Sequence, residues 1–264
     1  MQIHFCKYQG AGNDFVMLDN LDGKYDSLSI AEISKLCDRR FGIGADGLIK
    51  ISSANNFDFE VDYYNSDGSK SFCGNGARCS VAFAKTLGID VTETSFLAID
   101  GDHEASLELD EVRLKMADVK HISKIEENYI LDTGSPHFIK FIAENEKFDV
   151  YQDGQVIRYS ETFKKEGINV NFVEKLKLPN HIFVSTYERG VENETLSCGT
   201  GVTGAAIAFA IKNNLIGKQE VDVKTKGGNL KVEFEIVQNS GEFEAQNVFL
   251  IGPAVFVFKG EFTL

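Results

Sequence analysis

Alternating apolar and polar positions predict strands along much of the chain. β-Branched and aromatic residues recur at every second position in five segments, a period typical of half-buried strands. These segments cover residues 2–9, 15–20, 59–65, 138–143 and 181–188. A hairpin is predicted where 221–226 and 230–237 flank the turn Gly227-Gly228-Asn229. Two further short strands are predicted on either side of Gly252-Pro253, between 248 and 262.

Three segments carry a helical period instead. In residues 29–39, apolar side chains recur at i, i+3 and i+4 behind Ser29, which can cap the first turn. Segments 77–87 and 202–214 are apolar around most of their circumference, and each follows a cysteine and a glycine-rich turn. A helix that is apolar all round belongs in a core. We therefore expect an α+β fold in which a mostly antiparallel sheet or barrel wraps around a central helix.

The chain also contains an internal repeat of about half its length. Cys73-Gly-Asn-Gly-Ala-Arg-Cys79 returns, about 125 residues later, as Cys198-Gly-Thr-Gly-Val-Thr-Gly204. Three more motif pairs recur in the same order at nearly the same offset: 10–16 with 134–139, 42–44 with 167–169, and 64–65 with 187–188. The repeat predicts two pseudosymmetric lobes, residues 1–115 and residues 116–264, with the active site in the cleft between them. The C-terminal strands either stay in the second lobe or cross back to the first.

Composition limits the classes of function. A chain of 264 residues with 43% hydrophobic and 25% charged residues is typical of a globular protein with one large or two ordinary domains. The net charge of -13 and the pI near 4.9 argue against nucleic-acid binding, which needs clustered Lys and Arg. The N-terminus does not resemble a signal peptide, and no apolar run approaches the ~18 residues of a membrane span. We expect a cytoplasmic protein that does not bind membranes.

The five cysteines show no disulfide framework, since their number is odd and their spacing irregular. Cys6 and Cys37 lie on apolar positions of predicted elements and are expected to be buried as small hydrophobes. No metal site is expected, because Cys73 and Cys79 lack CxxC spacing and no histidine is near them in sequence.

The glycine-rich turns predict an anion site. Residues 42–47 and 199–204 both match GxGxxG, but the first leads into a strand and the second lacks a βαβ continuation, which argues against dinucleotide binding. A helix that begins at such a turn presents backbone N–H groups and the positive end of its dipole. A substrate carboxylate and a cysteine thiolate are both stabilised there. The alternative, that Cys73 and Cys198 are small residues tolerated in tight turns, does not explain their repetition.

Six motifs, taken in order, resemble diaminopimelate epimerases across nearly the whole chain. They are GAGNDFV, RRFGIGADG, YNSDGSKSFCGNGARC, GSPHFI, GINVNFVE and YERGVENETLSCGTG. The resemblance implies two lobes with a central helix in each, a homodimer, and interconversion of LL- and meso-diaminopimelate for lysine and cell-wall synthesis. It also implies that the reaction uses no cofactor.

The resemblance further implies site residues. Cys73 and Cys198 match the two catalytic thiols, one acting as base and the other as acid. Asparagines and backbone turns match the substrate-binding groups, the pair Glu188-Arg189 matches the residues that engage the ammonium and carboxylate groups, and His137 with Glu188 is expected to tune the thiols. The expected substrate-binding residues are Asn13, Asn65, Gly74, Asn75, Asn169, Glu188, Arg189, Gly199 and Thr200. Asn13, Asn65 and His137 also fit purely structural roles in turns and loops.

The chain departs from the family pattern at two positions. Ser135 stands where the family often has asparagine, and Gly47 where some members carry glutamine. Three alternative functions stay open: a cofactor-independent racemase or epimerase for proline or hydroxyproline, a non-catalytic binding module, and a cysteine hydrolase. The hydrolase needs a histidine base beside one cysteine.

Overall fold

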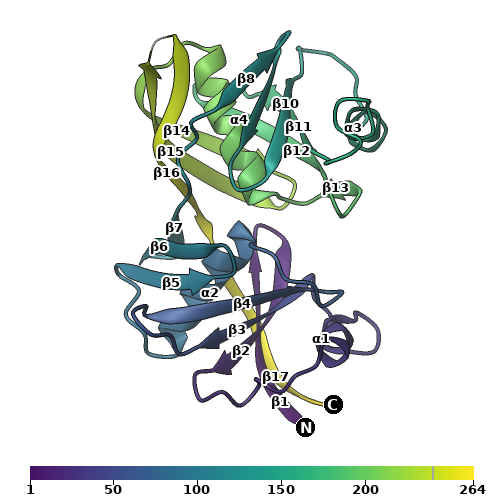
Figure 1. Cartoon of the computed structure of the whole chain (residues 1–264), viewed down its shortest axis with the longest axis vertical. Coiled ribbons are helices and arrows are strands. Elements are labelled where there is room, and N and C mark those ends of the chain that lie inside the picture. Colours follow the sequence, from purple (N-terminus) through teal and green to yellow (C-terminus); the bar gives the residue numbers. More distant parts are fainter. Residues whose placement is uncertain (240) are drawn as a thin grey trace. The chain divides into compact units, whose positions relative to one another are not determined.

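The computed structural model describes residues 1–239 and 241–264. These residues form an α+β fold with four helices and a large mixed sheet. The chain divides into two compact units, Met1–Leu114 together with Gly252–Leu264, and Lys115–Ile251. Figure 1 shows the course of the chain through the elements of each unit.

The first unit is a sheet in which consecutive strands are neighbours. Its first strand, β1, pairs on one side with β2 and on the other with the last strand of the chain, β17. From β2 the order continues through β3, β4, β5 and β6 to β7. The strands are β1 (Gln2–Gly10), β2 (Asn13–Asn20), β3 (Gly47–Ser52), β4 (Phe59–Asn65), β5 (Thr94–Ala98), β6 (Gly101–Glu108), β7 (Glu111–Lys115) and β17 (Val255–Thr263).

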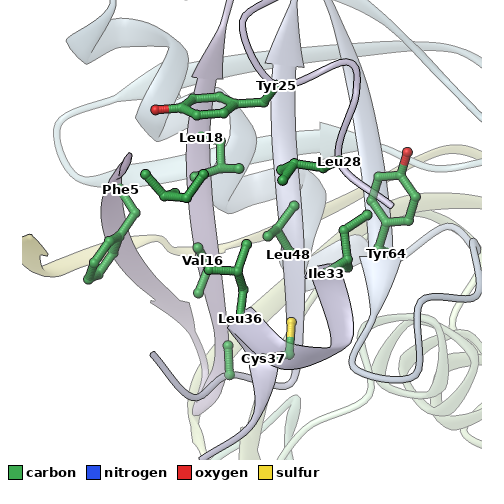
Figure 2. Packing of buried hydrophobic residues seen from close by; sticks show 12 residues of the cluster. Phe5, Val16, Leu18, Tyr25, Leu28, Ile33, Leu36, Cys37, Leu48 and Tyr64 are labelled. Carbon is green, nitrogen blue, oxygen red and sulfur yellow. The ribbon is translucent and has the colours of Figure 1, made fainter. Parts of the chain in front are cut away.

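Two helices lie on this sheet. Helix α2 (Gly74–Thr86) is buried along most of its length and contacts β1, β2, β3, β4 and β6. Helix α1 (Ile30–Cys37) is shorter and begins with a capping box between Ser29 and Glu32. Figure 2 shows Ile33, Leu36 and Cys37 packing against apolar side chains of β1, β2 and β3. The expected burial of Cys37 on the apolar face of its helix is thereby confirmed.

The second unit contains the other strands of the sheet and two helices. Helix α4 (Gly199–Lys212) is buried on almost every side and contacts β9, β10, β11, β12, β14 and β15, whereas α3 (Val150–Arg158) packs against β11 and β12. The strands are β8 (Ile122–Ile125), β9 (Asn128–Asp132), β10 (Pro136–Phe141), β11 (Asn169–Lys175), β12 (His181–Glu188), β13 (Asn193–Thr195), β14 (Gly217–Thr225), β15 (Gly228–Asn239) and β16 (Glu242–Pro253).

The two units share one order of strand pairing. From β1 to β7, successive pairs are antiparallel, parallel, antiparallel, parallel, antiparallel and antiparallel. The same order runs through β9, β10, β11, β12, β14, β15 and β16. In each unit the long buried helix lies in the connection between the strands of the second parallel pair. The repeated motifs of the sequence therefore accompany a repeated topology.

Several element predictions are confirmed and others are wrong. The strands at 59–65 and 181–188 have the predicted limits, and Ser29 caps α1 as expected. The two buried helices begin at Gly74 and Gly199, three residues before the predicted starts, because the glycine turns are themselves the first helical turns. Helix α3 was not predicted, and the two C-terminal strands, β16 and β17, are long rather than short.

Within the described residues, every helix is too short or too polar to cross a lipid bilayer.

Candidate active site

The two repeated cysteines occupy equivalent positions at helix starts. Cys73 is the N-cap residue of α2 with φ -138° and ψ 115°, and Cys198 is the N-cap residue of α4 with φ -118° and ψ 111°. Neither side chain caps its own helix. In both helices the N–H of the fourth helical residue, Ala77 or Val202, donates to the cysteine carbonyl over 2.8 Å. The chain thus presents both sulfurs beside the N–H groups of a first helical turn.

In the first unit, Cys73 belongs to a hydrogen-bond network at the start of α2. Its sulfur donates to Oδ1 of Asn13 over 3.5 Å, and Nδ2 of Asn75 donates to the same oxygen over 3.4 Å. The Asn13 amide is oriented from the other side, because its Nδ2 donates to the carboxylate of Asp46 over 2.7 Å. The structure thus brings Cys73, Asn13 and Asn75 together, as the sequence predicts.

The guanidinium of Arg78 donates hydrogen bonds to this network from inside the core. Arg78 is fully buried, and it donates to Oδ1 of Asn75 over 2.8 Å and to the carbonyl of Gly74 over 3.3 Å. Burial lowers the pKa of Arg78, although the neighbouring Cys79 and Cys73 act against this. Burial raises the pKa of Cys79 to about 12, so that thiol stays neutral. Cys79 is a packing residue.

Asn65 lies at the end of β4 and is engaged by its own turn. Its Nδ2 donates to the hydroxyls of Ser69 and Ser71, each over 3.1 Å, and its Oδ1 accepts from the hydroxyl of Tyr63 over 2.8 Å. These contacts fit the structural role in a turn. Its expected substrate contact stays a prediction.

In the second unit, a chain of polar side chains leads to Cys198. The sulfur lies 3.4 Å from Oγ1 of Thr200, and that hydroxyl lies 2.9 Å from Nε2 of His137. The other ring nitrogen of His137, Nδ1, lies 3.0 Å from Nδ2 of Asn171. His137 is fully buried, and burial together with the charge of Arg189 lowers its pKa to about 3. The imidazole is therefore neutral at neutral pH.

A second group of polar residues surrounds Ser135. Its hydroxyl accepts from Nδ2 of Asn169 over 2.9 Å and from the guanidinium of Arg189 over 3.3 Å. Oδ1 of Asn169 in turn accepts from the backbone N–H of Arg189 over 2.8 Å. The structure brings these two expected substrate-binding residues together, and Ser135 is the link between them. Glu188 precedes Arg189 at the end of β12 and is half-buried.

Gly47, the other departure from the family pattern, has a steric reason in this chain. A Cβ atom there would lie 2.5 Å from Cε2 of Tyr63 and 2.5 Å from the carbonyl of Tyr64. A larger residue at this position requires a different placement of β4. The absence of a glutamine therefore agrees with the packing of this unit.

Sequence reasoning missed Asn171 and Arg78, two buried residues that contact the expected site. Asn171 interrupts the apolar run of β11, and Arg78 is a fully buried charged residue inside an apolar helix. A polar residue in an otherwise buried segment was the available signal. Among the described residues, His, Cys, Asp and Glu side chains nowhere gather in a group of three that could bind a metal ion.

The chain matches the family model for diaminopimelate epimerase over residues 5–122 and 129–257. It is 48% identical over 256 residues to a diaminopimelate epimerase of Flavobacterium psychrophilum, covering 96% of this chain and 97% of the relative. Solved structures with a similar fold include a PhzF-family phenazine biosynthesis protein of Bacillus anthracis, at a TM-score of 0.74 and 12% identity with 100% of both chains covered. A hydroxyproline epimerase of Agrobacterium vitis matches at a TM-score of 0.67 and 12% identity, covering 100% of this chain and 93% of that one.

The family model and the solved structures together define the class, an α+β fold of the diaminopimelate epimerase and PhzF type, and at such identities the solved structures establish the fold alone. The sequence match is more specific. The chain belongs to the diaminopimelate epimerase family, a family of isomerases.

Proposed function

We propose that this chain interconverts LL- and meso-diaminopimelate by proton transfer between the substrate and two thiols, Cys73 and Cys198. Diaminopimelate epimerase activity follows from membership of the family, and it places the chain in lysine biosynthesis. One structural observation carries the proposal for the thiols. The two cysteines have nearly the same backbone conformation at the first turns of two equivalent buried helices.

The reaction requires removal of a weakly acidic α-hydrogen and its return to the opposite face of the same carbon. A thiolate takes the proton, and a thiol delivers another, so one cysteine must be ionised and the other neutral. The cysteines exchange these states when the reaction runs in the opposite direction.

The helix starts supply the electrostatic part of the mechanism. We propose that backbone N–H groups of Gly74, Asn75, Gly199 and Thr200 bind the carboxylate at the reacting carbon. As the C–H bond breaks, negative charge moves onto that carboxylate, and N–H groups oriented in advance stabilise it. Exclusion of water keeps the carbanion from taking a proton from solvent.

The remaining polar residues are proposed to bind the rest of the substrate. Asn13 and Asn75 lie beside Cys73, while Asn169 and Arg189 form the cluster around Ser135. Glu188 and Asn65 complete the proposed set, with Glu188 engaging an ammonium group. Diaminopimelate carries a second amino-acid centre remote from the reacting one, and its charged groups require such partners.

We further propose that the two compact units are the lobes of a duplicated fold. The shared order of strand pairing and the matched cysteines support this proposal. The cleft between lobes, the homodimer and the cytoplasmic location stay predictions from the family resemblance.

The test is exchange of the α-hydrogen in heavy water by purified protein without added cofactor. Diaminopimelate should incorporate deuterium, whereas proline and hydroxyproline should not. Cys73→Ser and Cys198→Ala should each reduce epimerisation by about a hundredfold to ten-thousandfold, as loss of a general acid or base does, and both should keep the wild-type circular dichroism spectrum. Wild-type turnover in either variant would refute the two-thiol mechanism.

A further inference from the structure

In the series of hydrogen bonds that ends at Cys198, the donor and acceptor of each bond can be assigned. The assignment starts from a backbone carbonyl. Nδ2 of Asn171 lies 3.3 Å from the carbonyl oxygen of Phe138, which can only accept a hydrogen bond. The Asn171 amide must therefore present its nitrogen on this side. The hydroxyl of Thr186 donates to Oδ1 of Asn171 over 2.9 Å and holds the opposite end.

The amide orientation determines the tautomer of His137. The same Nδ2 has a second hydrogen, which it donates to Nδ1 of His137 over 3.0 Å. Nδ1 is thus an acceptor, and the single proton of the neutral imidazole is on Nε2. His137 therefore donates from Nε2 to the hydroxyl oxygen of Thr200 over 2.9 Å.

The Thr200 hydroxyl is in turn the donor to the sulfur of Cys198. Since its oxygen accepts from His137, its own hydrogen is free to point at Sγ of Cys198, 3.4 Å away. The carbonyl of Thr200 is separately held by the hydroxyl of Thr133 over 2.8 Å, which fixes this first helical turn. A sulfur that receives a hydrogen bond is favoured as a thiolate.

We propose that Asn171 and Thr200 are positioning residues that hold Cys198 as the thiolate through the fixed Nε2–H tautomer of His137. The inference rests on the proposed role of Cys198 and adds two residues to it. His137 is not the base in this arrangement, because its only unprotonated nitrogen faces Asn171 and the Thr200 hydroxyl separates it from the sulfur. This geometry also argues against a cysteine hydrolase, which needs a histidine acceptor beside its nucleophile.

Helix α4 packs closely against the side chains of Asn171 and His137. Gly201 follows Thr200, and a Cβ atom on it would lie 2.3 Å from Oδ1 of Asn171 and 3.3 Å from Cε1 of His137. Only glycine lets the helix approach the two side chains at this distance. The first unit differs, because there the sulfur of Cys73 donates a hydrogen bond to Asn13 instead of accepting one from a threonine.

Two charged residues, Glu188 and Arg189, lie at the end of β12 near this network. Burial, and after it the cation of Arg189, lowers the pKa of His137 and keeps the imidazole neutral, as the tautomer assignment requires. Glu188 directly precedes Arg189. The variants below leave both residues in place, so their charges are the same in every comparison.

The first test measures ionisation of Cys198 by the pH dependence of its alkylation with iodoacetamide, followed by peptide mass mapping in a Cys73→Ser background. Thr200→Val keeps the shape of the side chain and removes the hydroxyl. It should move the midpoint of the rate profile upward by about one pH unit or more, the size expected for one lost hydrogen bond to a charged group. The midpoint reports ionisation, whereas accessibility changes only the plateau.

Thr203→Val is the matched control. Thr203 lies one turn along the same helix and is fully buried, and its hydroxyl bond among the described residues is to the carbonyl of Gly199 over 3.0 Å, outside the network. The midpoint for Cys198 should be unchanged in this variant. An unshifted midpoint in Thr200→Val would overturn the proposal, as would an equal shift in Thr203→Val.

The second test reads the tautomer directly in the unmutated protein. The ¹⁵N chemical shifts of labelled histidine distinguish a protonated Nε2 from a protonated Nδ1, and His137→Gln assigns the signal among the five histidines. We expect protonation at Nε2 alone near neutral pH, and a proton on Nδ1 would refute the inference.

Asn171→Leu should raise the Cys198 midpoint, and an unchanged midpoint in a folded Asn171→Leu protein would exclude the role of Asn171.

Failure of this inference differs from failure of the proposed function. The measured His137 tautomer or Cys198 midpoints can contradict the inference while α-hydrogen exchange with diaminopimelate persists. In that case the two-thiol mechanism stands, and only the role assigned to the network is refuted. If exchange itself is absent, the proposed function fails whatever the midpoints show.

Discussion

At the scale of single residues, Ser135 stands where the family resemblance leads us to expect asparagine. The hydroxyl accepts from both Asn169 and Arg189, so it orients two proposed substrate-binding groups at once. Accepting two hydrogen bonds leaves its own hydrogen available for a ligand. We infer that the serine replaces the asparagine by organising its neighbours rather than by reaching as far.

Ser135→Ala should therefore weaken substrate binding more than it affects the chemical step. Loss of the acceptor leaves the buried amide of Asn169 without this partner, which costs about 1–3 kcal/mol and corresponds to a rise in KM of roughly tenfold. Steady-state kinetics with diaminopimelate would measure it, and the pH midpoint for Cys198 should stay unchanged. Ser53→Ala removes an exposed hydroxyl that bonds only the carbonyl of Leu21 among the described contacts, and it is the control. A fall in kcat with constant KM would contradict this role.

The sequence indicated the two cysteines and, through the family resemblance, His137 and Thr200, but it did not indicate Asn171. Repetition of a cysteine before a glycine turn is visible in one dimension, because both copies keep the same local order. Asn171 and His137 come together only because β10 and β11 pair in parallel, with His137 opposite Asn169. That register depends on tertiary packing, so no local pattern predicts which buried polar side chain meets the imidazole.

At the scale of elements, α3 shows why a helix can escape prediction. Its sequence, VYQDGQVIR, contains Gly154 in the middle, and glycine disfavours a helix interior. The structure gives the reason for the glycine: a Cβ atom would lie 2.5 Å from Cβ and 2.7 Å from Cγ of Tyr187, which is fully buried in β12. Close contact with the sheet here outweighs helix propensity.

This contact reverses the usual effect of a glycine-to-alanine substitution in a helix. Gly154→Ala should lower the free energy of unfolding by about 1–3 kcal/mol, because the added methyl group overlaps a side chain that cannot move away. Gly204→Ala in α4 is the matched comparison, since its Cβ would meet Cδ1 of Ile139 at 3.6 Å, an ordinary contact distance. That substitution should be neutral or stabilise by up to about 1 kcal/mol. Urea denaturation of both variants would compare the two effects, and stabilisation by Gly154→Ala would contradict the packing argument.

At the scale of the whole molecule, the sequence left open whether the C-terminal strands stay in the second lobe or return to the first, and the structure assigns Gly252–Leu264 to the first unit. The repeat runs through β1–β7 and through β9–β16, and the last strand, β17, has no counterpart in that order. It pairs along the length of β1, with ring contacts from Phe258 to Phe5 and from Phe256 to Tyr8. A C-terminal strand that completes the first unit leaves no signal in its own residues, because its partner lies at the opposite end of the chain.

Removal of this strand tests how much the first unit depends on it. A chain ending at Pro253 lacks β17, so β1 keeps only its pairing with β2 and exposes an unpaired edge. The apolar faces of Phe5 and Tyr8, which are almost fully buried, would then meet water. We expect the truncated chain to aggregate or to unfold at a much lower temperature, and to lose epimerisation although Cys73 and Cys198 are intact. Val257→Thr is the control, because Val257 is 51% exposed and its replacement preserves the strand. Thermal unfolding followed by circular dichroism would decide: a truncated chain that melts at the temperature of the full chain would show that β1 is stable without its C-terminal partner.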